Sequence, residues 1–148
     1  MPQNPLKNPV NAFQFFVDIG DLKAYFMEAT GFDNNTDVSE VRHAIEKGKS
    51  VIMKVPVTSK WGDITLKRIF TDDNQLFAWR QMVLDGEAEK ARKSGSFTGY
   101  DEKGAPVIQF TIDRCWPTKW KGPSFNAKSN DPAIEEITLA HEGLKRVV

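Results

Sequence analysis

Cysteine, histidine and recognisable catalytic motifs are scarce in this 148-residue sequence, and each absence excludes a class of function. The single cysteine, Cys115, excludes an intrachain disulfide framework and a cysteine-rich zinc site. Neither GxGxxG nor GxxxxGK(S/T) occurs, so no glycine-rich loop for binding phosphate is expected. No apolar run approaches the roughly 18 residues that a membrane-spanning helix needs.

The two histidines, His43 and His141, indicate neither a metal site nor a catalytic pair. They lie far apart, and neither has a second ligand at metal-site spacing. His141-Glu142 would begin an HExxH motif, but Lys145 stands where the second histidine belongs. Because Cys115 has no base in a known catalytic context, we interpret it as a small apolar strand residue. The sequence therefore predicts no catalytic, cofactor-binding or metal-binding residue, and no cofactor.

Two pairs of adjacent carboxylates, Asp72-Asp73 and Glu135-Glu136, are the remaining candidates for acid–base chemistry. Neighbouring residues of a strand point to opposite faces, so Glu135 and Glu136 cannot converge on one substrate. Asp72 and Asp73 follow Thr71 and precede a helical pattern, so we interpret all three as plausible helix N-cap residues. Neither pair indicates an enzyme.

Tryptophan is better represented, at Trp61, Trp79, Trp116 and Trp120. Trp79 falls on the apolar stripe of a predicted helix and is expected in the core. Trp116 and Trp120 flank a predicted proline bend, where they would close the end of a barrel or form a ligand platform. We favour the first interpretation, and we interpret the basic residues near this bend as a solvated rim: Lys119, Lys121 and Lys128.

The spacing of apolar residues predicts a mainly β chain. Strands are expected over residues 13–19, 23–29, 64–70, 97–100, 107–115 and 133–139. One helix is expected from the stripe Leu76, Trp79 and Val83, widened by Phe77 and Leu84, with a stop at Gly86. Residues 116–123 should break the preceding strand, and residues 87–93 should extend the helix or form a loop. About seven strands and one helix predict a β-sandwich or β-barrel.

Residues 39–57 predict an unusually thin hairpin around the turn Glu46-Lys47-Gly48-Lys49, after a polar loop over 31–37. Its large apolar residues are few: Val41, Ile45, Val51, Met53 and Val55. A two-stranded ribbon of this kind cannot bury enough surface to be stable alone. It is therefore expected to lie across its own domain or to pack against a neighbouring chain.

The length favours a single domain. Residues 1–11 contain three prolines and three asparagines and predict an extended N-terminal arm, which leaves residues 12–148 as one domain. The start is polar, unlike a secretory signal, so synthesis and folding are expected in the cytoplasm.

Charge is balanced over the chain but not along it. The 20 Lys and Arg against 20 Asp and Glu argue against a non-specific nucleic-acid binder. Residues 1–40 hold 2 basic and 6 acidic side chains, residues 41–80 hold 8 and 4, and residues 81–148 hold 10 of each. Opposed segments with net charges of −4 and +4 offer complementary surfaces for self-association.

The C-terminal third carries a long and unusual block, from Cys-Trp-Pro-Thr-Lys-Trp at Cys115 to His-Glu-Gly-Leu at Leu144. This block closely resembles the end of the phage tail tube protein family, which supplies the inner tube of contractile phage tails and of phage-tail-like contractile injection systems. Further matches follow in order at Phe15–Ile19, Gly31-Phe32, Ile64–Arg68, Asp72-Asp73, Leu76 and Trp79. The resemblance covers residues 13–144.

The resemblance implies a β-barrel of two packed sheets with one α-helix, similar to the type VI secretion tube protein. Six copies would form a ring, and rings would stack into a hollow tube inside a contractile sheath. The implied partners are further copies of the chain, the sheath protein, and baseplate and tube-terminating proteins. The lumen would hold effector cargo or DNA, without specific nucleic-acid recognition and without catalysis. Assembly would occur in the cytoplasm, and the particle would be released or membrane-anchored.

Three alternatives stay open at this point. The chain could serve a phage tail that conducts DNA, although we favour an injection system. It could be a baseplate-proximal paralogue rather than the trunk subunit. It could also be a small β-barrel module that binds a ligand at the bend between Trp116 and Trp120. The sequence does not indicate which residues would line a lumen.

Overall fold

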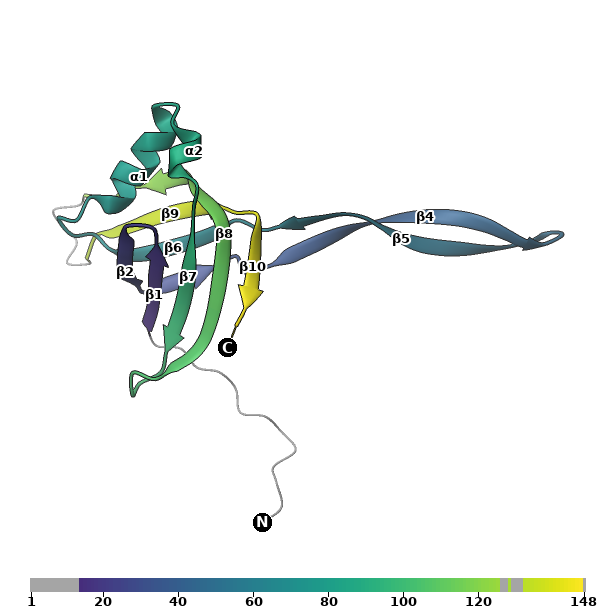
Figure 1. Cartoon of the computed structure of the whole chain (residues 1–148), viewed down its shortest axis with the longest axis horizontal. Helices are drawn as coiled ribbons and strands as arrows, with labels where there is room; N and C mark the ends of the chain where they lie inside the picture. Colours follow the sequence, from purple (N-terminus) through teal and green to yellow (C-terminus); the bar gives the residue numbers. More distant parts are fainter. Residues whose placement is uncertain (1–13, 126–127, 129–131, 148) are drawn as a thin grey trace, which may run out of the picture.

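Two β-sheets enclose one core, and a long β-ribbon projects from them (Figure 1). The computed structural model describes residues 14–125, 128 and 132–147, so the arm expected over residues 1–11 lies outside the described residues. The single domain over 12–148 stays a prediction. The body contains the strands β1 (Gln14–Ile19), β2 (Leu22–Phe26), β3 (Glu28–Thr30), β6 (Ile64–Ile69), β7 (Lys93–Tyr100), β8 (Pro106–Lys121), β9 (Ile134–Ala140) and β10 (Gly143–Arg146). The ribbon is β4 (Asn34–Glu46) with β5 (Lys49–Trp61), and the helices are α1 (Gln75–Leu84) and α2 (Ala88–Ala91).

Strand β8 belongs to both sheets of the body. The strand order is β2-β1-β7-β8-β9-β6-β3, and β10 pairs with β8 off this path. The first part of β8 pairs with β7 and β10, whereas the part from Trp116 onward pairs with β9. Between the two parts, Arg114 has a positive φ of 46°, and the register with β7 shifts between Lys93 and Gly95. Such an irregularity bends a strand, and here it carries β8 from one sheet into the other.

The core lies between the sheets and follows the alternation seen in the sequence. Its buried residues are Val17, Ile19, Leu22, Phe26, Ile64, Leu66, Leu76, Trp79, Ala91, Phe97, Ile112, Cys115, Ile137 and Leu139. The prediction of a mainly β fold with two packed sheets is confirmed. No helix of the described residues has the length and apolar character needed to cross a membrane.

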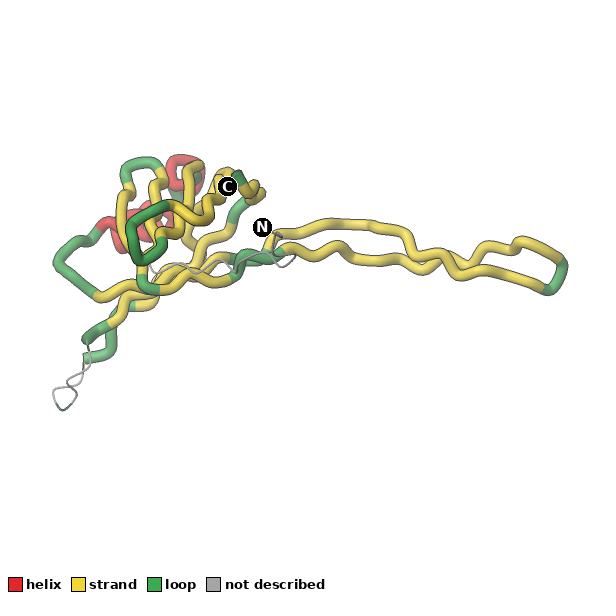
Figure 2. Tube along the Cα trace, turned by 90° about the horizontal axis from the view of Figure 1, so that it is seen from below, coloured by secondary structure: helices red, strands yellow, loops and turns green. Residues whose placement is uncertain are grey.

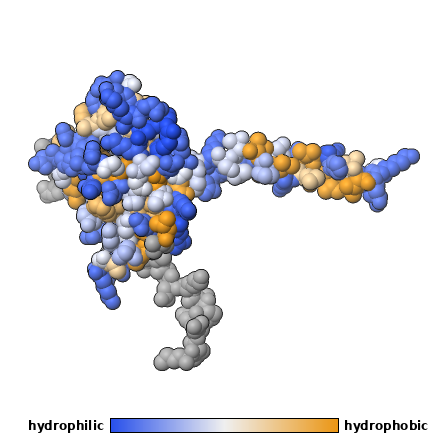
Figure 3. Space-filling view, in the orientation of Figure 1, coloured by the Kyte–Doolittle hydropathy of each residue, from blue (hydrophilic) through white to orange (hydrophobic). Residues whose placement is uncertain are grey.

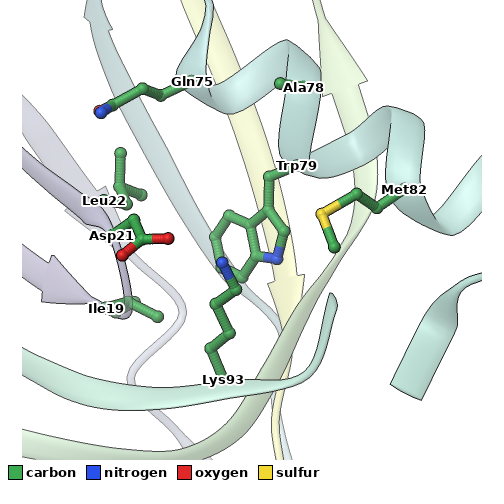
Figure 4. Close-up of a pocket in the computed structure, with 8 residues that line it drawn as sticks. All are labelled: Ile19, Asp21, Leu22, Gln75, Ala78, Trp79, Met82 and Lys93. Atoms are coloured by element: carbon green, nitrogen blue, oxygen red, sulfur yellow. The ribbon is translucent and has the colours of Figure 1, made fainter. Parts of the chain in front are cut away.

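Helix α1 covers one end of the body, where Trp79 enters the core. The indole Nε1 of Trp79 donates a hydrogen bond of 2.6 Å to the carbonyl oxygen of Ala91 in α2. Figure 4 shows Trp79 and Met82 facing Leu22 and Lys93 across a pocket of about 180 Å³. The predicted helix is confirmed. Its buried apolar stripe is narrower than expected, because Phe77 and Leu84 are 46% and 61% exposed.

A second, short helix corrects the prediction of a single helix. Residues 87–93 neither extend α1 nor form a plain loop, because Gly86, with φ of 84°, ends α1 and α2 begins at Ala88. A residue with positive φ terminates a helix readily when it is glycine. The chain can then turn back so that Ala91 packs into the core.

The N-cap residue of α1 is not one of the three predicted candidates, Thr71, Asp72 and Asp73. The capping residue of α1 is Asn74, whose side chain makes no cap hydrogen bond. The Asp73 Oδ1 atom instead accepts a hydrogen bond of 3.0 Å from the Gln75 backbone N–H, while Asp72 and Thr71 are exposed. One of the three candidate residues therefore contributes to the cap, from one position further out.

The proline at 117 does not break β8, which corrects the predicted bend over 116–123. The strand continues to Lys121, with a register shift against β9 between Pro117 and Lys119. Pro117 has no N–H to offer a ladder, and the shift accommodates it. Its carbonyl oxygen accepts a hydrogen bond of 3.1 Å from Arg80 Nη1 of α1.

Three further boundaries differ from the predictions. The run 23–29 is two strands, β2 pairing with β1 and β3 pairing with β6, because the chain crosses between sheets at Met27. The polar loop over 31–37 ends early, since β4 begins at Asn34. The strand predicted last, β9, is followed by β10, so the described residues form ten strands rather than seven.

A buried ion pair joins β6 to β9 inside the body. Arg68 Nε donates to Glu135 Oε1 at 2.8 Å, and the Glu135 side chain is 1% exposed. Trp120 Nε1 donates to the second carboxylate oxygen at 3.0 Å. Arg68 also lies 3.7 Å from the Asp73 carboxylate, and its guanidinium stands 5.8 Å from the Phe26 ring centre. The ion pair therefore connects β6 and β9 with Asp73, just before α1, and with Trp120.

We expect Glu135→Gln to lower the free energy of unfolding by about 3 kcal/mol, because it leaves a buried guanidinium incompletely compensated. Glu136→Gln is the matched control: it removes the same charge from the opposite face of the same strand and should change stability by less than about 0.5 kcal/mol. Chemical denaturation followed by tryptophan fluorescence measures both values. Equal stabilities of the two variants would contradict the assigned role of the pair.

Candidate assembly interface

The cross-strand register of the ribbon sorts its side chains onto two different faces. One face is mainly apolar and pairs Ser39 with Val55, Val41 with Met53, and His43 with Val51. We call these six residues the apolar face. The opposite face is mixed and pairs Val38 with Pro56, Glu40 with Lys54, and Arg42 with Ile52. Because side chains alternate along each strand, one ribbon presents two chemically distinct surfaces.

Nothing in the described body covers this ribbon. Every residue of β4 and β5 is exposed, and the two strands run away from the sheets side by side (Figure 2). Figure 3 shows hydrophobic residues gathered along the ribbon, with a hydrophilic tip. On the apolar face, Val41, Val51, Met53 and Val55 are between 39% and 51% exposed. Of the two expectations for the hairpin, packing across its own domain is wrong.

The root of the ribbon is fixed by hydrogen bonds rather than by burial. The Gly62 N–H donates a hydrogen bond of 2.9 Å to the Asp33 carbonyl oxygen. His141 Nε2 donates to the Gly62 carbonyl oxygen at 3.0 Å, and the His141 and Trp61 ring centres are 5.7 Å apart. These contacts tie the point where both strands leave the body to the end of β9. The direction of the ribbon is therefore set by the body.

An apolar groove opens at the other end of β1 and β7 from α1. It has a volume of about 340 Å³ and is lined by Phe15, Ala29, Phe32, Phe97, Thr98, Gly99, Ile108 and Phe110. We call it the phenylalanine groove. The Phe32 ring centre lies 5.5 Å from that of Phe97, edge to face, and 5.4 Å from that of Phe110, stacked. Body and ribbon thus each present an apolar surface.

The sequence did not indicate the phenylalanine groove as a site. Its lining residues come from β1, β3, β7, β8 and the segment before β4, and the sequence predicted strands around Phe15, Phe97 and Phe110 without showing that they meet at one surface. The one signal was Phe32, a lone aromatic residue in an otherwise polar segment.

The residues considered for catalysis do not converge. Cys115 is buried in β8, as interpreted from the sequence, and its Sγ donates to the Lys93 carbonyl oxygen at 3.1 Å. His43 lies on the exposed ribbon, whereas His141 lies at its root. Glu135 and Glu136 point to opposite faces, as predicted. Among the described residues, no three His, Cys, Asp or Glu side chains gather as a metal site.

Trp116 and Trp120 lie on the continuous strand β8 and do not form an open platform. Trp116 and Trp120 are partly buried against the core. The Trp120 indole N–H binds Glu135, and its ring meets Phe77 edge to face at 5.0 Å between centres. Of the neighbouring basic residues, Lys119 and Lys121 lie exposed on β8, and Lys128 is exposed beyond it. The interpretation of these aromatics as packing residues fits this geometry.

Comparison with known proteins identifies relatives of this arrangement. The model of the family described as T4-like virus tail tube protein gp19 matches residues 11–145. A search of curated proteins finds no match. Among solved structures, the chain is similar to one in the PVC sheath–tube complex of an extracellular contractile injection system in its extended state. The two share 25% identity with a TM-score of 0.76, over 96% of this chain and 93% of that chain.

Two other solved structures show the same fold. A chain in the anti-feeding prophage cap, the AFP tube terminating cap, has 23% identity and a TM-score of 0.77, covering 99% of this chain and 95% of that chain. Hcp1 from Flavobacterium johnsoniae has 16% identity and a TM-score of 0.56, covering 90% and 94%. The predicted similarity to secretion tube proteins is therefore confirmed at the level of the fold.

Burial raises the pKa of the Cys115 thiol from 9.0 to about 12. We expect Ellman's reagent at pH 8 to react with Cys115 about a thousandfold more slowly in the folded protein than in guanidinium chloride, because three pKa units lower the thiolate fraction by that factor. The absorbance of the released thiolate measures both rates. Fast reaction of the folded protein would contradict an inert, structural thiol.

Proposed function

The chain belongs to the T4-like virus tail tube protein family, and from this premise we propose that it is a structural subunit of the inner tube of a contractile injection system. Copies of it form six-membered rings, and the rings stack into a hollow conduit that sheath contraction drives forward. The observation that carries this proposal is the ribbon, whose apolar face has no partner in the described part of its own chain.

Injection is favoured over DNA conduction by one likeness. The relative with 25% identity and near-complete coverage comes from the sheath–tube complex of an extracellular contractile injection system. The family model is named for a virus tail, which keeps a phage tail tube as the second candidate. Neighbouring genes separate the two: capsid and terminase genes belong with a phage, and an AAA-family ATPase gene beside sheath and baseplate genes belongs with an injection system.

The partners follow from the same relatives. Two of them come from a sheath–tube complex and from a tube terminating cap. We propose that this chain likewise contacts its own copies, a sheath protein, and baseplate and tube-terminating proteins, and that effector cargo passes through the lumen. Assembly in the cytoplasm and release of the particle, or its anchoring at a membrane, complete the proposal.

The work proposed for the subunit is mechanical rather than catalytic. A conduit that is pushed through a barrier needs subunits that do not deform, and hydrogen-bonded sheets around a packed core provide such stiffness. Strand β8 couples the two sheets, and the Arg68–Glu135 pair couples β6 to β9. The buried, protonated Cys115 supplies no nucleophile to this body.

We expect the purified chain to form rings or tubes visible by negative-stain electron microscopy, and deletion of Glu46 to Lys49 to shorten or abolish them. The deletion removes the tip of the only surface that reaches far beyond the body in the described chain. The double substitution Glu46→Gln with Lys49→Gln keeps the hairpin length and is the control. The same measurement on a variant lacking residues 2–9 tests the N-terminal arm. Tubes of normal length from both deletions would count against these contacts.

We expect assembly to weaken as salt rises, because residues 1–40 and 41–80 carry net charges of −4 and +4. Between 0.15 and 1 M salt the Debye length falls from about 8 Å to about 3 Å, which screens attraction between such surfaces. Sedimentation of assembled material across this range, at fixed protein concentration, measures the effect. Assembly that does not change with salt concentration would contradict a role for attraction between the oppositely charged segments.

A further inference from the structure

We propose that the phenylalanine groove is the acceptor for the apolar face of a ribbon that belongs to a second copy of this chain, with Met53 seated against Phe32, Ile108 and Phe110. This inference rests on the proposed function and names the surface on which the ribbon docks. The donor surface is the ribbon face that pairs Val41 with Met53. The acceptor surface is the apolar groove of about 340 Å³ at the end of the body away from α1.

The ribbon cannot fill the groove of its own chain. Its strands have 13 residues each, and an extended strand of that length reaches about 40 Å. The ribbon leaves the body and runs straight away from it in both views (Figures 1 and 2). Met53 pairs with Val41 in the outer half of this projection, so it can meet a groove only on another molecule.

The two surfaces match in chemistry. The groove is lined mainly by aromatic and aliphatic side chains, and Phe32, Phe97 and Phe110 form its aromatic wall. Methionine is flexible and its thioether makes favourable contacts with aromatic rings, which suits an irregular cavity of this kind. Met53 is 51% exposed in the single chain, so docking would remove apolar surface from water on both partners.

The surroundings of the two surfaces also carry opposite charge. Between residues 34 and 61 the ribbon holds five basic and three acidic side chains. Next to the groove, three acidic residues, Asp33 after Phe32 and Asp101 and Glu102 after β7, outnumber two basic ones, Lys103 in that turn and Arg146, which pairs with Phe110. A net positive ribbon and a rim with an excess of acidic residues would favour the approach of one copy to the next.

The described part of each chain carries one donor surface and one acceptor surface, and the two adjoin at the ribbon root. Phe32 of the groove stands two residues before Asn34, where β4 begins. In each copy, the ribbon received from a neighbour would therefore lie beside the root of that copy's own ribbon. A contact between two different surfaces of identical chains repeats from copy to copy, and it closes into a ring when the rotation allows.

Cross-linking between two single-cysteine variants tests the docking directly. In a Cys115→Ala background, a chain with Met53→Cys is mixed with a chain with Ile108→Cys, assembled, and treated with a short bismaleimide. We expect a covalent dimer of the two different chains on a denaturing gel. The matched control replaces Met53→Cys by Ile52→Cys, which lies next in sequence on the opposite face with similar exposure, 56% against 51%.

The outcomes separate this inference from the proposed function. A dimer with Met53→Cys and little with Ile52→Cys supports the docking. Tubes that form without the Met53–Ile108 dimer, or with equal dimer from both positions, overturn the docking and leave the tube function intact. Reaction of Ile108→Cys with Leu6→Cys in the same chain, in place of Met53, would put the amino-terminal segment in the groove and also overturn it. Failure of the wild-type chain to assemble overturns both.

A pair of substitutions supplies an independent measurement. Met53→Glu should raise the protein concentration needed for assembly at least about tenfold, because docking would bury an unpaired carboxylate. Ile52→Glu adds the same charge opposite Arg42 on the mixed face and should change that concentration by less than about threefold. Both sites are exposed in the single chain, so circular dichroism should show both variants folded. Equal effects of the two substitutions would overturn the docking.

Discussion

A two-stranded ribbon has no interior, and this constraint governs the rest of the molecule. Each strand pairs on one side only, and both faces of the pair meet water. Full burial of a valine or methionine side chain stabilises by roughly 1.5–3 kcal/mol, and the four large apolar residues of the apolar face are about half exposed. Several kcal/mol of burial are thus unrealised in one chain. A second surface has to supply them, and in a homo-oligomer that surface is carried by another copy.

The body holds the ribbon at its root and sets its direction. No residue of β4 or β5 belongs to its core, which lies between its own sheets and the helices α1 and α2. The ribbon leaves it through Gly31, whose φ is 94° and where a Cβ atom would collide with the Asp63 carbonyl oxygen. Only glycine adopts such a turn at little cost. Together with the Gly62–Asp33 and His141–Gly62 hydrogen bonds, this turn fixes the direction in which the ribbon leaves the body.

The sequence predicted those features that depend on local periodicity. Strands with clear alternation and the helix around Leu76 and Trp79 appear where expected, and the thin hairpin appears over a longer range, 34–61 instead of 39–57. What could not be predicted depends on contacts between distant residues. Arg68 lies on the same buried face of β6 as Ile64 and Leu66, and its burial is explained by Glu135, 67 positions away in the sequence. From the sequence, Pro117 is expected to end the strand, but a register shift against β9 accommodates it within β8. The groove escapes detection for the same reason, because its four phenylalanines span residues 15 to 110.

The edges of the ribbon would make its proposed association specific. Exposed strand edges invite pairing with any other strand, and lysines, prolines and bulges are the features that prevent it. This ribbon has Pro56 in β5, register irregularities after Thr36 and after Ala44, and Lys47 and Lys49 at its tip. Its backbone edges are thus protected, whereas its apolar face is not. In the proposed docking, association proceeds through side chains that fit a shaped apolar groove. That selectivity is what an ordered stack of identical rings requires.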